Sequence, residues 1–193
     1  MCYYVCSGNI SADRTSGEKE MNYVLKDDVL YIREMTVEDT DMVIGWRNMD
    51  FVMANFLYRT KLTREDHLNW IRTKVETGKV RQFIIGLNEN FREFGSVYFR
   101  DIDNEQKSCE FGIFLGDKEM LGKGYGFRAQ KLAMDIALNE MGMEYISLRV
   151  LEKNLAAIRT YEKCGFTHIE DKSDFLPTGE KVIFMEYVTG EKK

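Results

Sequence analysis

A glycine-rich turn between a strand and a helix sets the tightest limit on the fold of this chain. The turn reads Leu121-Gly122-Lys123-Gly124-Tyr125-Gly126 and joins a predicted strand, 109–115, to a predicted helix that begins near Tyr125. Glycine has no Cβ, so backbone N–H groups can turn inward there. The first turn of a helix adds N–H donors without partners and a positive dipole end. With Lys123 and Arg128 beside it, the segment predicts a cradle for an anion such as pyrophosphate, although three glycines alone would also suit a flexible surface turn.

Length and charge argue against several classes of protein. The chain has 193 residues, which suits one domain with a sizeable core. Its net charge of −5, with no block of Lys or Arg, argues against general nucleic-acid binding. No apolar run approaches the roughly 20 residues that span a bilayer. The N-terminus also lacks an apolar signal segment, so a cytoplasmic location is expected.

The cysteines do not predict a metal site. The four cysteines are Cys2, Cys6, Cys109 and Cys164. Their spacing fits no usual zinc pattern, so no metal is expected. Cys109 and Cys164 lie within apolar patterns and are expected to be buried as small hydrophobic residues.

The hydrophobic pattern predicts one α+β domain with a mostly antiparallel sheet of six to seven strands. The loops between the central strands are short, which favours antiparallel neighbours. The domain is expected to cover residues 28–193, behind a flexible N-terminal extension at 1–27. The predicted helices are 36–47, 64–77, 125–142 and 155–163. The predicted strands are 29–33, 82–87, 95–100, 109–115 and 145–150, followed by a hairpin of 166–175 and 182–188.

The position of the glycine-rich turn argues against two familiar phosphate sites, although dinucleotide binding stays a competing hypothesis. A Rossmann turn follows the first, parallel strand and is followed by an acidic residue about 20 positions later. Here the turn comes late and follows an apparent antiparallel meander. A P-loop places Ser or Thr directly after its lysine, whereas Gly124 follows Lys123.

Further residues accompany the turn at a specific separation. The preceding strand reads Glu110-Phe111-Gly112-Ile113-Phe114-Leu115, and after the next predicted strand come Asn154, Ala157, Ile158, Tyr161-Glu162-Lys163 and Gly165-Phe166. Together with the turn they resemble the GNAT family of N-acetyltransferases, over about residues 28–188. The resemblance implies acetyl-CoA as the donor, and a central sheet flanked by helices in which a splayed pair of strands holds that donor.

A second group of residues points to one branch of that family. The branch is similar to the ribosomal-protein alanine acetyltransferases. Within it, Trp46-Arg47-Asn48 and the segment 62–71 look closest to the amino-sugar N-acetyltransferases of the pseudaminic acid pathway. The resemblance therefore implies a primary amine as the acceptor, with a nucleotide-linked amino sugar as the first expectation. A peptide N-terminus and a polyamine remain open alternatives, and so does a non-catalytic module that only binds acyl-CoA.

The resemblance assigns the residues that bind the donor. The pyrophosphate of acetyl-CoA is expected on backbone amides of Leu121, Gly122, Lys123, Gly124, Tyr125 and Gly126. The strand Ile113, Phe114 and Leu115 is expected to bond the pantetheine amides, and Asn154 to bond the same arm while capping a helix. The family often has Gln or Arg where Leu121 stands, so the backbone must supply that contact here.

The expected chemistry is direct acetyl transfer. Tyr161 matches the family's tyrosine near the CoA sulfur and is the predicted general acid, because a phenol can donate to a developing thiolate. Glu110 is the predicted general base, with a chain of waters as the alternative. Trp46, Arg47 and Tyr58 are expected to line the acceptor pocket together with Phe56. No nucleic-acid or membrane partner is expected, and the sequence leaves a homodimer open.

Overall fold

One continuous sheet organises the molecule. The computed structural model describes residues 23–190, and its strands are hydrogen-bonded in the order β1-β2-β3-β4-β5-β6-β9-β7, with β8 also paired to β9. All neighbouring strands are antiparallel except β5 and β6. The strands are β1 Tyr23–Lys26, β2 Leu30–Glu34, β3 Val80–Leu87, β4 Glu93–Asp103, β5 Ser108–Leu115, β6 Tyr145–Leu151, β7 Thr167–His168, β8 Asp174–Phe175 and β9 Lys181–Val188.

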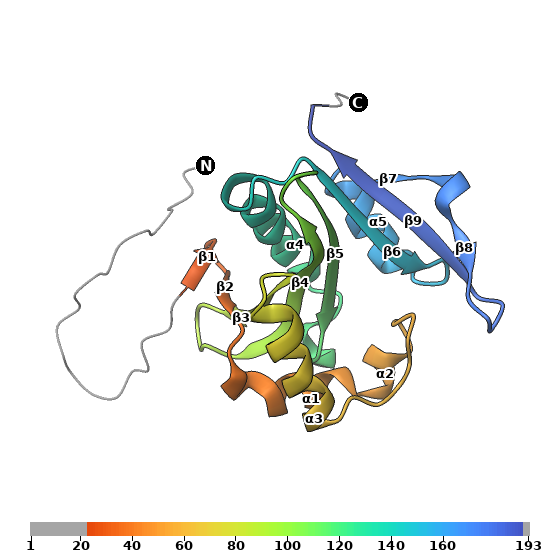
Figure 1. The fold of residues 1–193 in the computed structure, drawn as a ribbon. Coiled ribbons are helices and arrows are strands. Elements are labelled where there is room, and N and C mark those ends of the chain that lie inside the picture. Colours follow the sequence, from red (N-terminus) through yellow and green to blue (C-terminus); the bar gives the residue numbers. More distant parts are fainter. Residues whose placement is uncertain (1–22, 191–193) are drawn as a thin grey trace, which may run out of the picture.

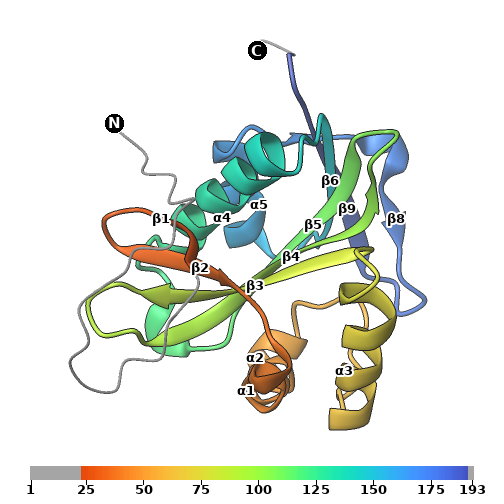
Figure 2. The ribbon, with the colours of Figure 1, turned by 60° about the vertical axis from the view of Figure 1, so that its left-hand side comes forward.

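Helices cover the sheet on both faces (Figures 1 and 2). Helices α4 and α5 lie on one face, and α1, α2 and α3 lie on the other. Both α3 and α4 end in a wider π-helical turn. The helices are α1 Thr40–Arg47, α2 Asp50–Met53, α3 Arg64–Trp70 with its π-turn Ile71–Val75, α4 Tyr125–Asp135 with its π-turn Ile136–Glu140, and α5 Leu155–Lys163.

The structure confirms the predicted fold class and corrects three details. The sheet has nine strands rather than six or seven. Strand β1 begins at Tyr23, before the expected domain boundary at residue 28, while residues 1–22 of the predicted extension lie outside the described residues. The predicted strand 166–175 is divided into β7 and β8 by a 3₁₀ turn at Glu170–Lys172. Both short strands are exposed, so no alternating apolar pattern marked where they end.

Strands β5 and β6 are paired over only the first part of their length. Their parallel pairing extends only from Ser108–Tyr145 to Glu110–Ser147. On its other edge β5 stays paired with β4 as far as Leu115. The second half of β5 therefore has free backbone groups facing β6, and a wedge-shaped gap opens through the sheet.

Each face of the sheet carries its own apolar cluster. Successive side chains of a strand point to opposite faces. Thus Val97, Phe99 and Phe111 join the large core beneath α4 and α5. Tyr98 and Phe114 join the smaller cluster beneath α1 and α3. Because the two faces meet at the gap, a ligand on one face can react with a ligand on the other.

Within residues 23–190, no helix combines the length and the apolar character needed to cross a bilayer. The same residues contain no group of three or more His, Cys, Asp or Glu side chains placed to hold a metal ion.

Candidate active site

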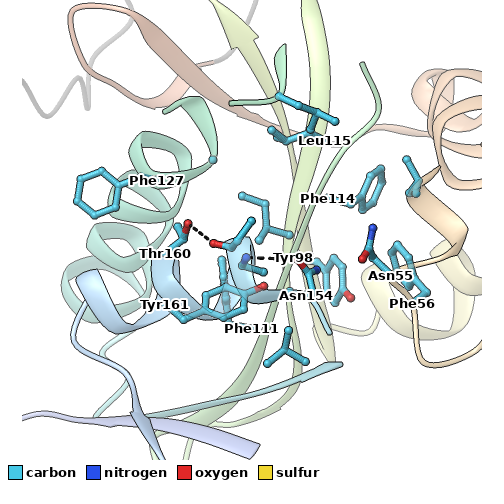
Figure 3. A pocket seen from close by; sticks show the side chains of 18 of the residues that line it. Asn55, Phe56, Tyr98, Phe111, Phe114, Leu115, Phe127, Asn154, Thr160 and Tyr161 are labelled. Carbon is cyan, nitrogen blue, oxygen red and sulfur yellow. Dashed lines mark hydrogen bonds between the residues drawn. The ribbon is translucent and has the colours of Figure 1, made fainter. Parts of the chain in front are cut away.

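A cavity of about 470 Å³ occupies the gap between β5 and β6. It is lined from the α4 and α5 side by Phe111, Phe127 and Tyr161, and from the opposite side by Tyr98 and Phe56. Figure 3 shows Phe111, Tyr161, Tyr98 and Phe56 around one space, with Tyr161 entering from α5 and Phe56 on the opposite wall, while the Phe127 ring lies apart from them beside α4. The cavity therefore has a side next to the glycine-rich turn, here called the donor side, and a side beneath α1–α3, here called the acceptor side.

The glycine-rich turn forms one end of the donor side. Gly122 and Gly124 have φ of 74° and 82°, in the left-handed region that glycine enters without steric cost. Gly124 is the N-cap of α4, and the first helical bond runs from the Arg128 N–H to the Gly124 carbonyl. The N–H groups of the first turn of α4 therefore lack helical partners. Gly122, Gly124 and Gly126 all line the cavity, which suits backbone binding of a pyrophosphate.

The two basic residues near this turn have different surroundings. Arg128 forms ion pairs with Asp27 and Asp28 in the β1–β2 connection, so its guanidinium links α4 to that connection. Lys123 is exposed. Leu121 is also largely exposed and lines the cavity with an apolar side chain. A phosphate at this turn is therefore met by backbone amides more than by side-chain cations.

We expect Gly124→Ala to weaken the binding of CoA about tenfold. No atom lies within 4 Å of a Cβ built at Gly124, so the substitution acts through its left-handed backbone, which costs an L-residue about 1–2 kcal/mol. Isothermal titration with CoA measures the change. The matched control is Gly179→Ala in the β8–β9 turn, where φ is 84° and a Cβ also meets nothing. Equal CoA affinity in both variants would contradict a role of the turn in binding.

The donor side continues along β5 and the start of α5. Ile113, Phe114 and Leu115 line the cavity on the edge that β6 leaves free. Asn154 is the N-cap of α5, and its Oδ1 accepts a hydrogen bond of 3.3 Å from the Ala157 N–H. Its amide nitrogen has no partner among the described residues and also borders the cavity. The structure therefore brings the predicted donor-binding residues together around one space, except for Lys123, whose side chain is exposed and does not line the cavity.

Tyr161 reaches the cavity from the interior of α5. Its side chain is 7% exposed, and its ring meets Phe111 edge-on at a centroid distance of 6.3 Å. Burial raises the pKa of the Tyr161 phenol, and the nearby Tyr98 adds to the rise. The hydroxyl makes no hydrogen bond to the described residues. It is thus a protonated donor aimed at the space between the strands.

Glu110 lies at the last paired position of β5 and is flanked by two arginines. Its Oε1 accepts hydrogen bonds from Arg100, and its Oε2 accepts one of 3.1 Å from the Arg149 Nη2. Both oxygens of the Glu110 carboxylate are therefore engaged by guanidinium groups. The arrangement therefore suits Glu110 to hold Arg149 in place, and it leaves the predicted role as base to be tested by experiment.

The predicted acceptor residues divide between the cavity wall and the core. Tyr58 lines the cavity and is 68% exposed. Arg47 lies behind that wall: its guanidinium carbon is 3.3 Å from the centre of the Phe56 ring, and its Nη2 donates to the Tyr58 carbonyl. Trp46 is only 9% exposed and packs in the cluster beneath α1. The structure thus places Trp46 in the core, where a large aromatic side chain from an amphipathic helix is most often found.

Several residues of the acceptor side were missed at the level of sequence. Tyr98, Arg100 and Arg149 all line the cavity. Each points to the acceptor face because of strand register, which a single sequence does not specify. Tyr98 stands directly across from Gly112 in the β4–β5 ladder. A glycine opposite a tyrosine makes room for the ring.

Comparisons with known proteins agree with this geometry. The family model described as "Acetyltransferase (GNAT) domain" matches residues 30–167. An uncharacterized protein of Methanocaldococcus jannaschii is 28% identical over 144 residues, and this match covers 73% of the chain but only 28% of that protein. Acetyltransferase PseH of Campylobacter jejuni is 24% identical over 143 residues, covering 74% of the chain and 85% of that protein.

A solved structure shares the fold. The spermidine N-acetyltransferase of Vibrio cholerae, in complex with CoA and spermine, superposes with a TM-score of 0.75 at 20% identity and covers 82% of this chain and 95% of that one. The family model spans most of the chain, including the splayed strands and the glycine-rich turn. The chain therefore belongs to the GNAT acetyltransferase family and is an acetyl-CoA-dependent N-acetyltransferase.

Proposed function

We propose that this enzyme acetylates the primary amine of an amino sugar that carries an anionic group, a nucleotide-linked amino sugar in the first instance. The observation that carries the proposal is the charge of the acceptor side. The charged side chains that line the cavity are Arg100, Arg149 and Glu110 on the acceptor side and Lys163 at the end of α5. Because Glu110 is already paired with both arginines, the acceptor side keeps an excess of positive charge.

Arg149 is the group best placed to meet an anion. It lies two residues after Ser147, the last β6 residue that is paired with β5, and its side chain is 37% exposed. Both of its hydrogen bonds to Glu110 use the Nη2 atom. The remaining N–H groups of the guanidinium have no partner among the described residues, and such a fork suits phosphate oxygens.

Aromatic side chains complete the acceptor side. Phe56, Tyr58 and Tyr98 line it, and Phe56 is held between Arg47 and Phe114. Flat aromatic surfaces suit the faces of a sugar or a nucleobase. This supports a substrate with both a ring and an anionic group, in agreement with the resemblance to the amino-sugar enzymes.

The chemistry of the proposal balances without a further reactant. The amine nitrogen bonds to the acetyl carbon, the carbon–sulfur bond breaks, and one proton from the amine ends on the CoA thiol. Free backbone N–H groups of β5 near Leu115 would polarise the thioester carbonyl, and Tyr161 would donate to the leaving sulfur. Glu110 or a water would carry the amine proton away.

A polyamine acceptor is the second candidate, supported by the fold shared with a spermidine enzyme. A polycation requires carboxylates in its pocket, because buried positive charges need partners. Glu110 is the only carboxylate among the described residues that line the cavity, and it is occupied by arginines. The charge balance therefore favours the anionic substrate.

A panel of acceptors tests the proposal. We expect transfer from acetyl-CoA to UDP-glucosamine with a higher kcat/KM than to glucosamine, spermidine or a peptide amine. We also expect Arg149→Gln to raise the KM for UDP-glucosamine about 10-fold to 100-fold, as for a lost hydrogen bond to a charged group, while the KM for acetyl-CoA stays unchanged. Measurement of CoA release gives both constants.

The matched control for this panel is Arg72→Gln. Arg72 is exposed on α3 and contacts Asn69 rather than the cavity. A preference of the wild-type enzyme for spermidine, or equal effects of Arg149→Gln and Arg72→Gln, would overturn the anionic-acceptor proposal.

A further inference from the structure

The Tyr98 ring occupies space that is open only because residue 112 is a glycine. It lies directly across from Gly112 in the β4–β5 ladder. A Cβ built on Gly112 would stand 2.2 Å from the Tyr98 Cζ and 2.4 Å from its hydroxyl oxygen. The hydroxyl end of the ring therefore lies against Gly112, two residues beyond the last β5 position paired with β6. This places a phenol at the start of the gap, on the acceptor side.

The Tyr98 hydroxyl is available to a ligand. Tyr98 lines the cavity, and its hydroxyl makes no hydrogen bond to any described residue. The Tyr98 side chain is half-buried, so its hydroxyl can be reached from the cavity. Figure 3 shows Tyr98 on the same side of the cavity as Asn55 and Phe56, across from Tyr161. A substrate in the cavity can therefore form a hydrogen bond with this hydroxyl.

The groups around Tyr98 define its protonation state. Burial raises the pKa of the Tyr98 phenol, while Arg100, Arg47 and Arg149 oppose the rise and Glu110 adds to it. The phenol stays neutral, so its oxygen can accept a hydrogen bond from an amine N–H. The same arginines disfavour a further positive charge beside them. An amine bound here is therefore favoured in its neutral, nucleophilic form.

We propose that Tyr98 is a catalytic residue whose hydroxyl oxygen accepts a hydrogen bond from the acceptor amine and aims its lone pair at the acetyl carbon. Tyr161 donates a hydrogen bond to the leaving sulfur from the donor side, and Tyr98 accepts one from the amine on the acceptor side. As the nitrogen–carbon bond forms, the amine N–H groups become more acidic and the hydrogen bond to Tyr98 strengthens. Tyr98 itself neither gains nor loses a proton. This inference rests on acetyl transfer to an amine and not on which amine is used.

Tyr98→Phe tests the role, because phenylalanine keeps the ring over Gly112 and removes only the hydroxyl. Two acceptors are used: UDP-glucosamine, and hydroxylamine, a small nucleophile that needs no sugar-binding groups. We expect kcat for transfer to either acceptor to fall about 10-fold to 100-fold, as for a lost hydrogen bond to a group that gains charge. The KM for acetyl-CoA and the melting temperature are expected to stay unchanged.

The matched control is Tyr187→Phe, which removes a phenol hydroxyl from β9, where the ring packs against Phe166 and does not line the cavity. Equal rates of transfer to hydroxylamine by the wild-type enzyme and by Tyr98→Phe would overturn the role of Tyr98. The same conclusion follows if neither protein accelerates this transfer. Failure of UDP-glucosamine alone, with a slowed hydroxylamine reaction in Tyr98→Phe, overturns the proposed acceptor and supports Tyr98.

Discussion

Tyr161→Phe is expected to lower kcat about 100-fold to 1,000-fold while leaving the affinity for CoA unchanged. A positioned hydrogen-bond donor that stabilises charge developing in the transition state contributes rate factors of this order. The substitution removes only the hydroxyl, so the edge-on packing of the ring on Phe111 is kept. Stopped assays of CoA release measure kcat, and isothermal titration measures CoA affinity.

The manner of donation follows from the pKa of Tyr161. Burial raises this pKa above its ordinary value, whereas a free thiol has a pKa of about 8.5. Full transfer of the phenol proton to a thiolate is therefore uphill. Tyr161 acts best by a hydrogen bond that stabilises the leaving sulfur, while the amine supplies the proton that finally stays on it. A Tyr161→Phe enzyme with full activity would remove Tyr161 from the mechanism.

Trp46→Ala is expected to reduce the free energy of unfolding by about 3–5 kcal/mol, the usual cost of truncating a large buried aromatic side chain. Trp46 packs with Val43, Ile84 and Phe114 between α1 and the sheet. The fit is close enough that a Cβ on Gly116 would stand 2.1 Å from the Trp46 Cγ. Urea denaturation followed by circular dichroism gives the difference in free energy.

The control for Trp46→Ala is Met49→Ala, which truncates an exposed side chain just beyond α1 and is expected to change stability by less than about 0.5 kcal/mol. The experiment also decides between two roles for the tryptophan. Unchanged stability together with a raised KM for the acceptor would contradict the core role and support contact between Trp46 and the acceptor.

The helices and central strands were largely predictable because their signals are local. Thr63 and Asp66 form a capping box at the start of α3, a signal contained in four successive residues, and α5 spans the predicted 155–163. Strand β1 was not predicted because it is a four-residue edge strand, too short for its alternation to stand out from the polar sequence before it. The π-helical ends of α3 and α4 also leave no distinct mark in the hydrophobic pattern.

The donor side could be predicted residue by residue, whereas the acceptor side could not. The glycine-rich turn, Asn154 and Tyr161 belong to short motifs whose geometry is set by the nearest residues. Trp46 and Tyr98 are both aromatic residues with a polar tip. Nothing in their local sequence distinguishes the one that enters the core from the one that reaches the cavity.

The sequence by itself determined the fold class and the donor, since left-handed glycines, helix starts and capping residues act over a few positions of the chain. Only the tertiary structure decided the acceptor side. Its wall comes from α2 and the segment after it, from β4, and from β6, which lie far apart in sequence. The positions of the Arg149 and Glu110 side chains in the cavity depend on the register of β5 and β6 and on where their pairing ends. That register is fixed by packing across the whole sheet and not by any one segment.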